Sequence, residues 1–249
     1  MAAPRLYELK ILPEFRRRVK DLSLNEFLNS DMELLRWIRA RENNLGQAEL
    51  MLRAHMKWRE EVSFDQLLLL DMPKQYEAVI LDIILGLDND NCPVVLSHLD
   101  KWDMKRMLQE FGPDALLRSK WKLEKELQEA MKNKLTSEGV PVTQSSIICD
   151  LEGLSISQGT FTVLRFLSDA ARIDEANFPE SLKTWVVINA PWSFPIFFKC
   201  AKPFVSEKTK SKIHVYGANR KEWMKFLGSV FPHHVLPVKY GGSNSIEIP

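Results

Sequence analysis

Five lysines lie in and just after an aromatic segment in the last third of the chain. The segment runs from Trp192 to Val205. Ammonium groups bind anions such as phosphate, and large apolar side chains favour surroundings other than water. The two together are typical of a surface that meets an anionic membrane interface. The lysines are Lys199, Lys202, Lys208, Lys210 and Lys212.

The aromatic segment is too rich in apolar residues to form one narrow stripe on a helix. A helix that is apolar around much of its circumference is either buried or faces something other than water. Pro191, Pro195 and Pro203 are expected to set its ends, because proline is poorly tolerated inside helices. The apolar residues are Trp192, Phe194, Ile196, Phe197, Phe198, Phe204 and Val205.

Side chains that could catalyse a reaction or hold a metal form no recognised pattern. The adjacent His233 and His234 lack a carboxylate at ligand spacing, which favours an exposed loop. Cys149 has no histidine near it in sequence, so we expect a small buried core residue. Residues 88–91 lack the glycine and distal glutamate of a calcium loop, which favours a hairpin turn. We therefore expect no enzymatic activity, no metal and no cofactor.

The composition narrows the class of protein. The chain has 249 residues, of which 45% are hydrophobic, so it can build a sizeable core. Its net charge of +1 gives no global reason to bind nucleic acid. Three widely spaced cysteines favour a reducing cytosol, and no stretch resembles a signal peptide or a spanning helix. Contact with a membrane is expected to be reversible and from the cytoplasm.

Residues 1–62 have helical periodicity, and residues 63–77 are expected to be a connector. Pro13 is expected to start one helix and Asp31 to cap the next. Three arginines interleave with apolar residues in this second helix, and spacing alone favours solvated guanidinium groups. They are Arg36, Arg39 and Arg41.

From residue 78 onward, short β-branched runs alternate with amphipathic segments. This alternation predicts an α/β domain over residues 78–249, with parallel strand pairs in a mixed sheet and helices beside it. We expect strands at 79–87, 93–99, 145–149, 184–188 and 213–216, and helices starting at 112, 161 and 222.

Several segments, taken in order, resemble the CRAL-TRIO lipid-binding and lipid-transfer family. They cover about residues 30 to 242 and include LLRWIRAREN, IICDLEGLS, FPESLKTWVVINAPWSFP, KPFVSEKTKSKI and LPVKYGG. The resemblance implies an apolar cavity on a sheet, closed by a mobile gate helix at Trp192–Val205. It also implies a non-enzymatic carrier that binds one hydrophobic molecule and transfers it between membranes, preferably anionic ones.

The C-terminal half is most similar to the animal branch of the family that includes supernatant protein factor, also called tocopherol-associated protein. Relatives in that branch continue into a Golgi-dynamics (GOLD) domain, and we expect this chain to end before it at Pro249. The branch implies an isoprenoid-type ligand such as tocopherol, squalene, a retinoid or a carotenoid.

Members that bind phosphatidylinositol hold its headgroup with residues that this chain matches. The resemblance assigns this role to Arg41, Glu180, Thr209 and Lys212. Lysine and arginine would neutralise the phosphate, and Glu180 would accept hydrogen bonds from inositol hydroxyls. From the residues alone, Glu180 and Lys212 could equally form an exposed ion pair worth under about 1 kcal/mol.

Because of two departures from the family pattern, the sequence does not decide which ligand binds. Glu42 stands where phosphatidylinositol binders have lysine, and a carboxylate there disfavours phosphate unless it points away. Ser145 keeps one hydroxyl of a headgroup-binding Ser-x-Thr pair, but Ile147 replaces the threonine of phosphatidylcholine binders. Phosphatidylinositol and an isoprenoid both remain candidate ligands. A scaffold that presents a ligand-dependent surface to partner proteins is the alternative function.

Overall fold

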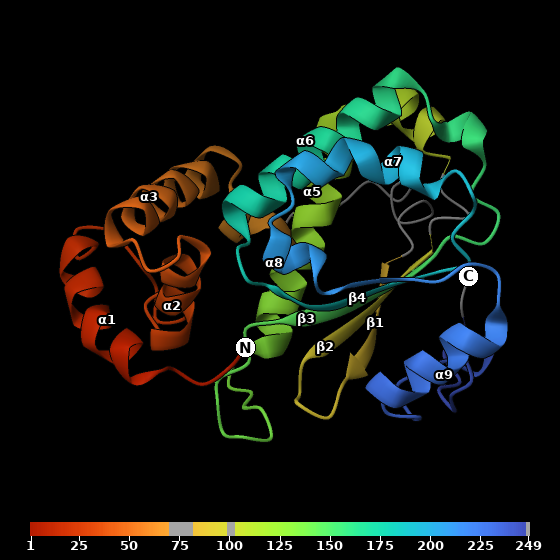
Figure 1. Cartoon of the computed structure of the whole chain (residues 1–249). Helices are drawn as coiled ribbons and strands as arrows, with labels where there is room; N and C mark the ends of the chain where they lie inside the picture. Colours follow the sequence, from red (N-terminus) through yellow and green to blue (C-terminus); the bar gives the residue numbers. More distant parts are fainter. Residues whose placement is uncertain (70–81, 99–102, 248–249) are drawn as a thin grey trace.

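The computed structural model describes residues 1–69, 82–98 and 103–247. The chain begins with α1 (Leu6–Arg18), α2 (Asp31–Ala40) and α3 (Leu45–Glu61), which lie together at one side of the molecule (Figure 1). Fully buried side chains, among them Phe15, Leu35 and Leu52, form the core between these helices.

The ends of the first two helices differ from the expectation. Pro13 lies inside α1, because the Glu8 carboxylate accepts a 2.8 Å hydrogen bond from the Arg5 backbone N–H and fixes the helix start earlier. Ser30, not Asp31, caps α2, and its hydroxyl accepts the Glu33 N–H.

Five strands form one mixed sheet in the order β1-β2-β3-β4-β5. The pair β1–β2 is antiparallel and the remaining pairs are parallel, as predicted for an α/β domain. The expected strand residues 79–81 and 99 lie outside the described residues. The strands are β1 (Asp82–Leu87), β2 (Pro93–His98), β3 (Ser145–Asp150), β4 (Leu182–Ile188) and β5 (Ile213–Val215).

The turn between β1 and β2 is a hairpin, as predicted for residues 88–91. Asp88 Oδ1 accepts hydrogen bonds from the backbone N–H groups of Asp90 and Cys92, at 2.9 and 3.0 Å. The Lys183 ammonium pairs with Asp88 and Asp90, at 2.7 and 2.9 Å. A lysine of β4 therefore offsets part of the negative charge of this turn.

Helices cover both faces of the sheet (Figure 1). One face carries α5 (Met104–Met131), α6 (Phe161–Asn177) and α7 (Phe194–Ala201), and the other carries α9 (Arg220–Val230). Short helical turns complete the described elements: η1 (Phe64–Leu69), η2 (Ile156–Gln158), η3 (Lys202–Phe204), α8 (Glu207–Lys210) and η4 (Val238–Tyr240).

α5 consists of two helical stretches that meet at a kink. The first begins at Met104, where Asp103 caps it by accepting the Arg106 N–H at 3.1 Å, and the sequence did not predict it. The backbone of Gly112 is non-helical, with a φ of 77°, and the second stretch follows it at Pro113, which agrees with the predicted helix start at residue 112.

Successive side chains along the strands point to opposite faces of the sheet. Leu96, Ile148 and Val186 are fully buried in the core that includes residues of α9. Their neighbours Val95 and Ile147 point to the other face, beneath α5, α6 and α7. Both faces are covered, which is why the strand sequences are almost continuously apolar.

Two buried contacts join the N-terminal helices to the end of α6 and to the segment that follows it. Arg36 Nε donates a 2.9 Å hydrogen bond to the Pro179 carbonyl, and its guanidinium pairs with Glu33 at 2.8 Å. His55 Nδ1 lies 3.1 Å from Asn177 Oδ1. Arg36 is therefore buried and paired, in contrast to the expectation of a solvated group. Of the expected connector, residues 70–77 lie outside the described residues.

Candidate functional site

A cavity of about 390 Å³ lies between the sheet and the helices α5, α6 and α7. Its walls are mainly apolar, and alternate residues of β2, β3 and β4 form its floor. The side chains that line it include Val95, Leu127, Ile147, Phe166, Phe178 and Trp185. A concave apolar space with a few polar groups is the usual form of a small-molecule site.

The aromatic segment forms one wall of this cavity. Phe194, Phe197 and Phe198 line the cavity from α7, whereas Trp192 and Ile196 are 80% and 45% exposed. The helix is thus apolar on its buried side and on its outer side. The interpretation as a buried helix is confirmed for the side that faces the cavity. The helix α7 covers Phe194–Ala201 and is therefore shorter than the predicted gate helix at Trp192–Val205.

The rest of the predicted gate follows α7 as a tighter turn and a short extended stretch. Phe204 is half-buried in η3, and Val205 lines the cavity. Lys199 and Lys202 lie exposed on the outside of this region. The exposed ammonium groups of Lys199 and Lys202 and the exposed Trp192 therefore lie on the outer surface of the segment Trp192–Val205, away from the cavity.

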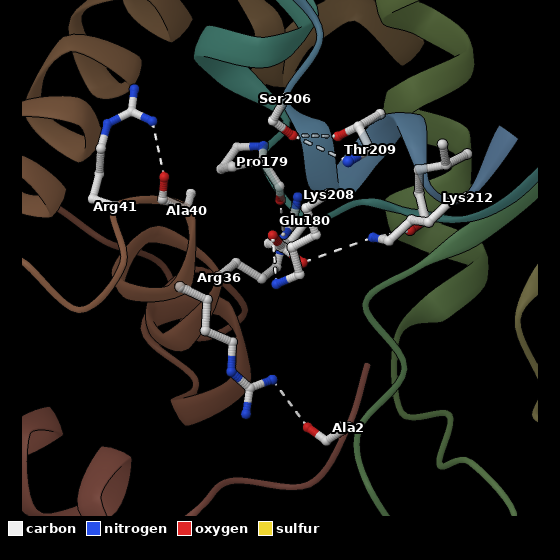
Figure 2. Close-up of polar contacts among 12 residues, drawn as sticks. Ala2, Arg36, Ala40, Arg41, Pro179, Glu180, Ser206, Lys208, Thr209 and Lys212 are labelled. Carbon is white, nitrogen blue, oxygen red and sulfur yellow. Dashed lines mark hydrogen bonds and ion pairs between the residues drawn. The ribbon is translucent and has the colours of Figure 1, made fainter.

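Three of the four predicted headgroup residues lie together at the cavity. Glu180, Thr209 and Lys212 all line it, and Lys212 Nζ lies 3.7 Å from a Glu180 oxygen (Figure 2). Lys212 also donates a 2.7 Å hydrogen bond to the Leu182 carbonyl. Thr209 Oγ1 lies 2.8 Å from Ser206 Oγ, which caps α8. Ser145 lines the same cavity from the first position of β3.

Arg41 is not brought to this group. Its guanidinium donates to the Ala40 carbonyl at 3.0 Å, and Arg41 does not line the cavity (Figure 2). The chain leaves α2 at Arg41 and turns through Glu42, whose φ is 50° and whose side chain is exposed. The Glu42 side chain is exposed and does not line the cavity. A glutamate in place of the lysine of phosphatidylinositol binders is therefore a weaker argument against phosphate binding than the sequence alone suggested.

Lys208 completes the headgroup cluster, which we define as Glu180, Lys208, Thr209 and Lys212. Lys208 Nζ lies 2.8 Å from Glu180 Oε1, closer than Lys212 does. The sequence assigned Lys208 only to the basic surface, because the one-turn helix α8 that aims it at Glu180 has no periodic signal. Burial lowers the pKa of Lys212, so this ammonium group loses its proton more easily unless an anion lies beside it.

The backbone at Glu180 adopts a rare conformation for a residue with a side chain. Its φ is 57°, in the left-handed region that favours glycine. Pro179 precedes it, and the carbonyls of Glu180 and Leu182 accept hydrogen bonds from the Gln144 side chain, at 2.9 and 3.0 Å. These contacts hold the turn that directs the Glu180 carboxylate toward Lys208 and Lys212.

A second group of polar residues in the cavity was missed at the sequence level. Lys120 and Glu124 of α5, Asp174 of α6 and the hydrogen-bonded pair Asp82–Ser97 all line the cavity. Lys120 Nζ lies 2.6 Å from both Asp174 carboxylate oxygens. A signal was present in the sequence, because Lys120 and Glu124 stand four residues apart beside the apolar Leu116, Leu123 and Leu127.

The residues considered for catalysis or metal binding stay apart. His233 and His234 lie in an exposed turn, as predicted. Cys149 is buried in β3, and burial raises the pKa of its thiol, so it stays protonated and unreactive. Within residues 1–69, 82–98 and 103–247, no three metal-ligating side chains form a group. In the same ranges, no helix has the length and apolar character to cross a membrane.

Comparisons with known proteins agree with this architecture. The SEC14 cytosolic factor of Yarrowia lipolytica is 32% identical over 222 residues, which cover 88% of this chain and 44% of that protein. The SEC14 cytosolic factor of Kluyveromyces lactis is 29% identical over 248 residues, covering 95% of this chain and 78% of that protein. This chain therefore spans less than half the length of the first relative.

A solved structure shares the fold. The crystal structure of Sfh5 superposes with a TM-score of 0.74 over 99% of this chain and 91% of that one, at 17% identity. Residues 79–242 match the CRAL/TRIO domain, which includes the whole sheet and every cavity-lining residue named above. The chain belongs to the CRAL/TRIO domain family.

Proposed function

We propose that this protein binds one hydrophobic lipid in the cavity and carries it between membranes without chemical change. The observation that carries the proposal is the cavity itself, about 390 Å³ of mainly apolar space between the sheet and α7. A cavity lined by apolar side chains favours an apolar occupant over water. We also propose that residues 78–249 form the lipid-binding domain and residues 1–62 a helical module joined through residues 63–77.

The proposal assigns α7 the role of a gate at the membrane. Ile196 is exposed on its outer side and Trp192 is exposed just before it. Gly159 packs against the inner Phe197, where a Cβ would lie 3.6 Å from the ring. Gly159 follows the exposed Ile156 and precedes the exposed Phe161. These four apolar side chains, with Lys199 and Lys202 beside them, suit the interface of an anionic bilayer.

Phosphatidylinositol is the first candidate ligand. The headgroup cluster supports it, because Lys208 and Lys212 could transfer from Glu180 to a phosphate while Glu180 accepts inositol hydroxyls. An isoprenoid-type lipid is the second candidate, as in the tocopherol-binding branch. The absence of Arg41 from the cavity lining favours it, since one of the four headgroup residues is then missing.

Action in the cytosol fits the names of the two relatives, both of which are called cytosolic factors. A scaffold that displays the lipid to partner proteins uses the same cavity. It differs in that a partner protein would bind only the lipid-filled protein.

Transfer of fluorescent phosphatidylinositol, and separately of tocopherol, from donor to acceptor vesicles tests the proposal. The test variant is Ala171→Trp, which fills the cavity, and the matched control is Ala176→Trp on the exposed side of the same helix. We expect the wild type and the control to transfer at least one lipid and the test variant to lose about tenfold or more. Transfer of neither lipid by the wild type, or full activity of Ala171→Trp, would overturn the proposal.

A further inference from the structure

A polar cluster lies within the apolar cavity and is separate from the headgroup cluster. It is supplied by β1, β2, α5 and α6, and we call it the α5–α6 polar cluster. Its members all line the cavity. They are Asp82, Ser97, Ser119, Lys120, Glu124 and Asp174.

The contacts within this cluster leave polar atoms for a ligand. Lys120 donates to both oxygens of Asp174 at 2.6 Å, and Ser97 bonds to Asp82 across the β1–β2 pair. Ser119, only 7% exposed, has a hydroxyl oxygen with no hydrogen-bond partner among the described residues. A buried hydroxyl without a partner in the wall of a cavity can be satisfied by a polar group of a ligand in that cavity.

Lys120 and Asp174 retain 34% and 36% of their side-chain surface accessible, although protein surrounds them on the cavity wall. This accessible surface includes the part that opens into the cavity. Burial alone would lower the pKa of Lys120, but Asp174 and Glu124 raise it above its ordinary value, so the ammonium stays charged. Burial raises the pKa of Glu124 and of Asp82 above their ordinary values, against the opposing effect of the nearby Lys120.

A purely hydrocarbon occupant is a poor match for this wall. It would displace water from Lys120, Glu124 and Asp174 and return no hydrogen bond to any of them. A hydroxyl group both accepts a hydrogen bond, from Lys120 or Ser119, and donates one to a carboxylate. The neighbouring cavity residues Leu116, Leu123 and Leu127 are apolar, so the wall suits one small polar group on an otherwise apolar molecule.

We propose that the α5–α6 polar cluster binds the hydroxyl of an otherwise apolar lipid and makes the cavity select such an alcohol over the hydrocarbon of the same skeleton. This inference rests on the proposed function, because it concerns the contents of the same cavity. It goes beyond that function by dividing the isoprenoid class, with alcohols and phenols favoured and squalene or unsubstituted carotenes disfavoured.

The test is a competition between phytanol and phytane, which share one branched skeleton and differ by a single hydroxyl. Both are supplied in equal amounts from vesicles, and native mass spectrometry measures the ratio bound to the protein. We expect the wild type to bind the alcohol with at least about tenfold preference, because a site with buried polar groups rejects a ligand that leaves them unpaired.

The variant Lys120→Met/Asp174→Leu removes both partners of the ion pair, and this avoids leaving one charge unpaired. We expect it to lose most of the preference for phytanol while still binding one molecule. Arg165→Met/Asp169→Leu is the matched control, because that pair has the same charges on α6 but is exposed, and its preference should equal that of the wild type.

The outcomes separate this inference from the proposed function. Equal binding of phytanol and phytane by the wild type overturns the inference and leaves the lipid carrier intact, and so does an unchanged preference in a folded double variant. Binding of neither molecule, nor of any lipid, overturns the proposed function and this inference with it. If the double variant fails to fold, the ratio in the wild type alone decides.

Discussion

In the proposed function, single polar side chains inside a mainly apolar cavity select the lipid that binds there. Lys212 is the clearest case, because its ammonium lies 3.7 Å from Glu180 and burial lowers its pKa. A half-buried lysine beside one carboxylate is poised to exchange that partner for a phosphate. Ser145 and Thr209 add hydroxyls to the same wall.

Replacing Lys212 should separate the two candidate ligands. We expect Lys212→Gln to slow phosphatidylinositol transfer about tenfold, since a hydrogen bond to a charged group is worth roughly 1.5 kcal/mol. Tocopherol transfer should change little. Lys210→Gln is the control, because Lys210 pairs with Glu207 and does not line the cavity. An equal loss for both lipids would remove the headgroup role of Lys212.

The sequence could identify Glu180, Thr209 and Lys212 only through the family pattern, and it included Arg41 for the same reason. A pattern reports which residue types recur, but the direction of the Arg41 side chain depends on the turn through Glu42. Lys208 was not assigned to this cluster because its contact with Glu180 joins the turn before β4 to α8, two segments that are far apart in the sequence. Local spacing carries no information on such a contact.

Among the elements, α7 is unusual in being apolar on both sides. Phe197 is buried against the cavity, whereas Trp192, just before the helix, is 80% exposed. The density of aromatic residues predicted this ambiguity, and the structure assigns each side chain to a side. Exposure of a large apolar residue outside a packed core is characteristic of a binding surface.

We expect Trp192→Ala to weaken binding to anionic vesicles about tenfold, because burial of an indole in the interface contributes at least roughly 1.4 kcal/mol. Leu6→Ala is the control, since Leu6 is also 80% exposed but lies on α1. Co-sedimentation with vesicles measures both. A loss of the same size in the two variants would show that α7 has no special contact with the bilayer.

The contact between α3 and α6 makes stability depend on pH. Burial, together with the nearby Arg59, lowers the pKa of His55 to about 3, and its Nδ1 lies 3.1 Å from Asn177 Oδ1. An unfolded histidine has a pKa of about 6.5, so below that pH the unfolded chain binds a proton that the folded chain does not. His55 therefore favours folding fully above pH 6.5, and this contribution is lost as the pH falls toward 3.

From this difference we expect the free energy of unfolding to drop by about 2 kcal/mol between pH 7 and pH 5 through His55 alone. Urea unfolding of the wild type and of His55→Leu at both pH values measures it. Between pH 7 and pH 5, the free energy of unfolding of His55→Leu should fall by about 2 kcal/mol less than that of the wild type, whatever the stability of the variant at pH 7. Parallel pH profiles would mean that the folded His55 takes up its proton normally.

At the scale of the whole molecule, the two faces of one sheet perform different tasks. Leu96, Ile148 and Val186 pack into the core with α9, whereas Val95 and Ile147 form the floor of the cavity. The sequence predicted the α/β class and most strands, because β-branched runs alternate with amphipathic segments. It could not show which face is hollow, since cavity walls and ordinary cores use the same residue types.

The helix predicted to start at Gly112 is the second of two helical stretches in α5. Gly112-Pro113 is a typical helix boundary, and the non-helical backbone of Gly112 divides the element at this point. The stretch before the kink brings Met104 and Met107 to the cavity wall. The local sequence rules applied to the chain found the second stretch and missed the first.

The central claim is that this fold encloses one lipid molecule. Native mass spectrometry of the protein after incubation with vesicles of mixed phospholipids and isoprenoid alcohols tests it most directly. The account predicts a complex of one chain with one lipid, which Ala171→Trp loses and Ala176→Trp keeps. Only ligand-free protein in both the wild type and the control, or several lipids bound equally well to Ala171→Trp, would contradict it.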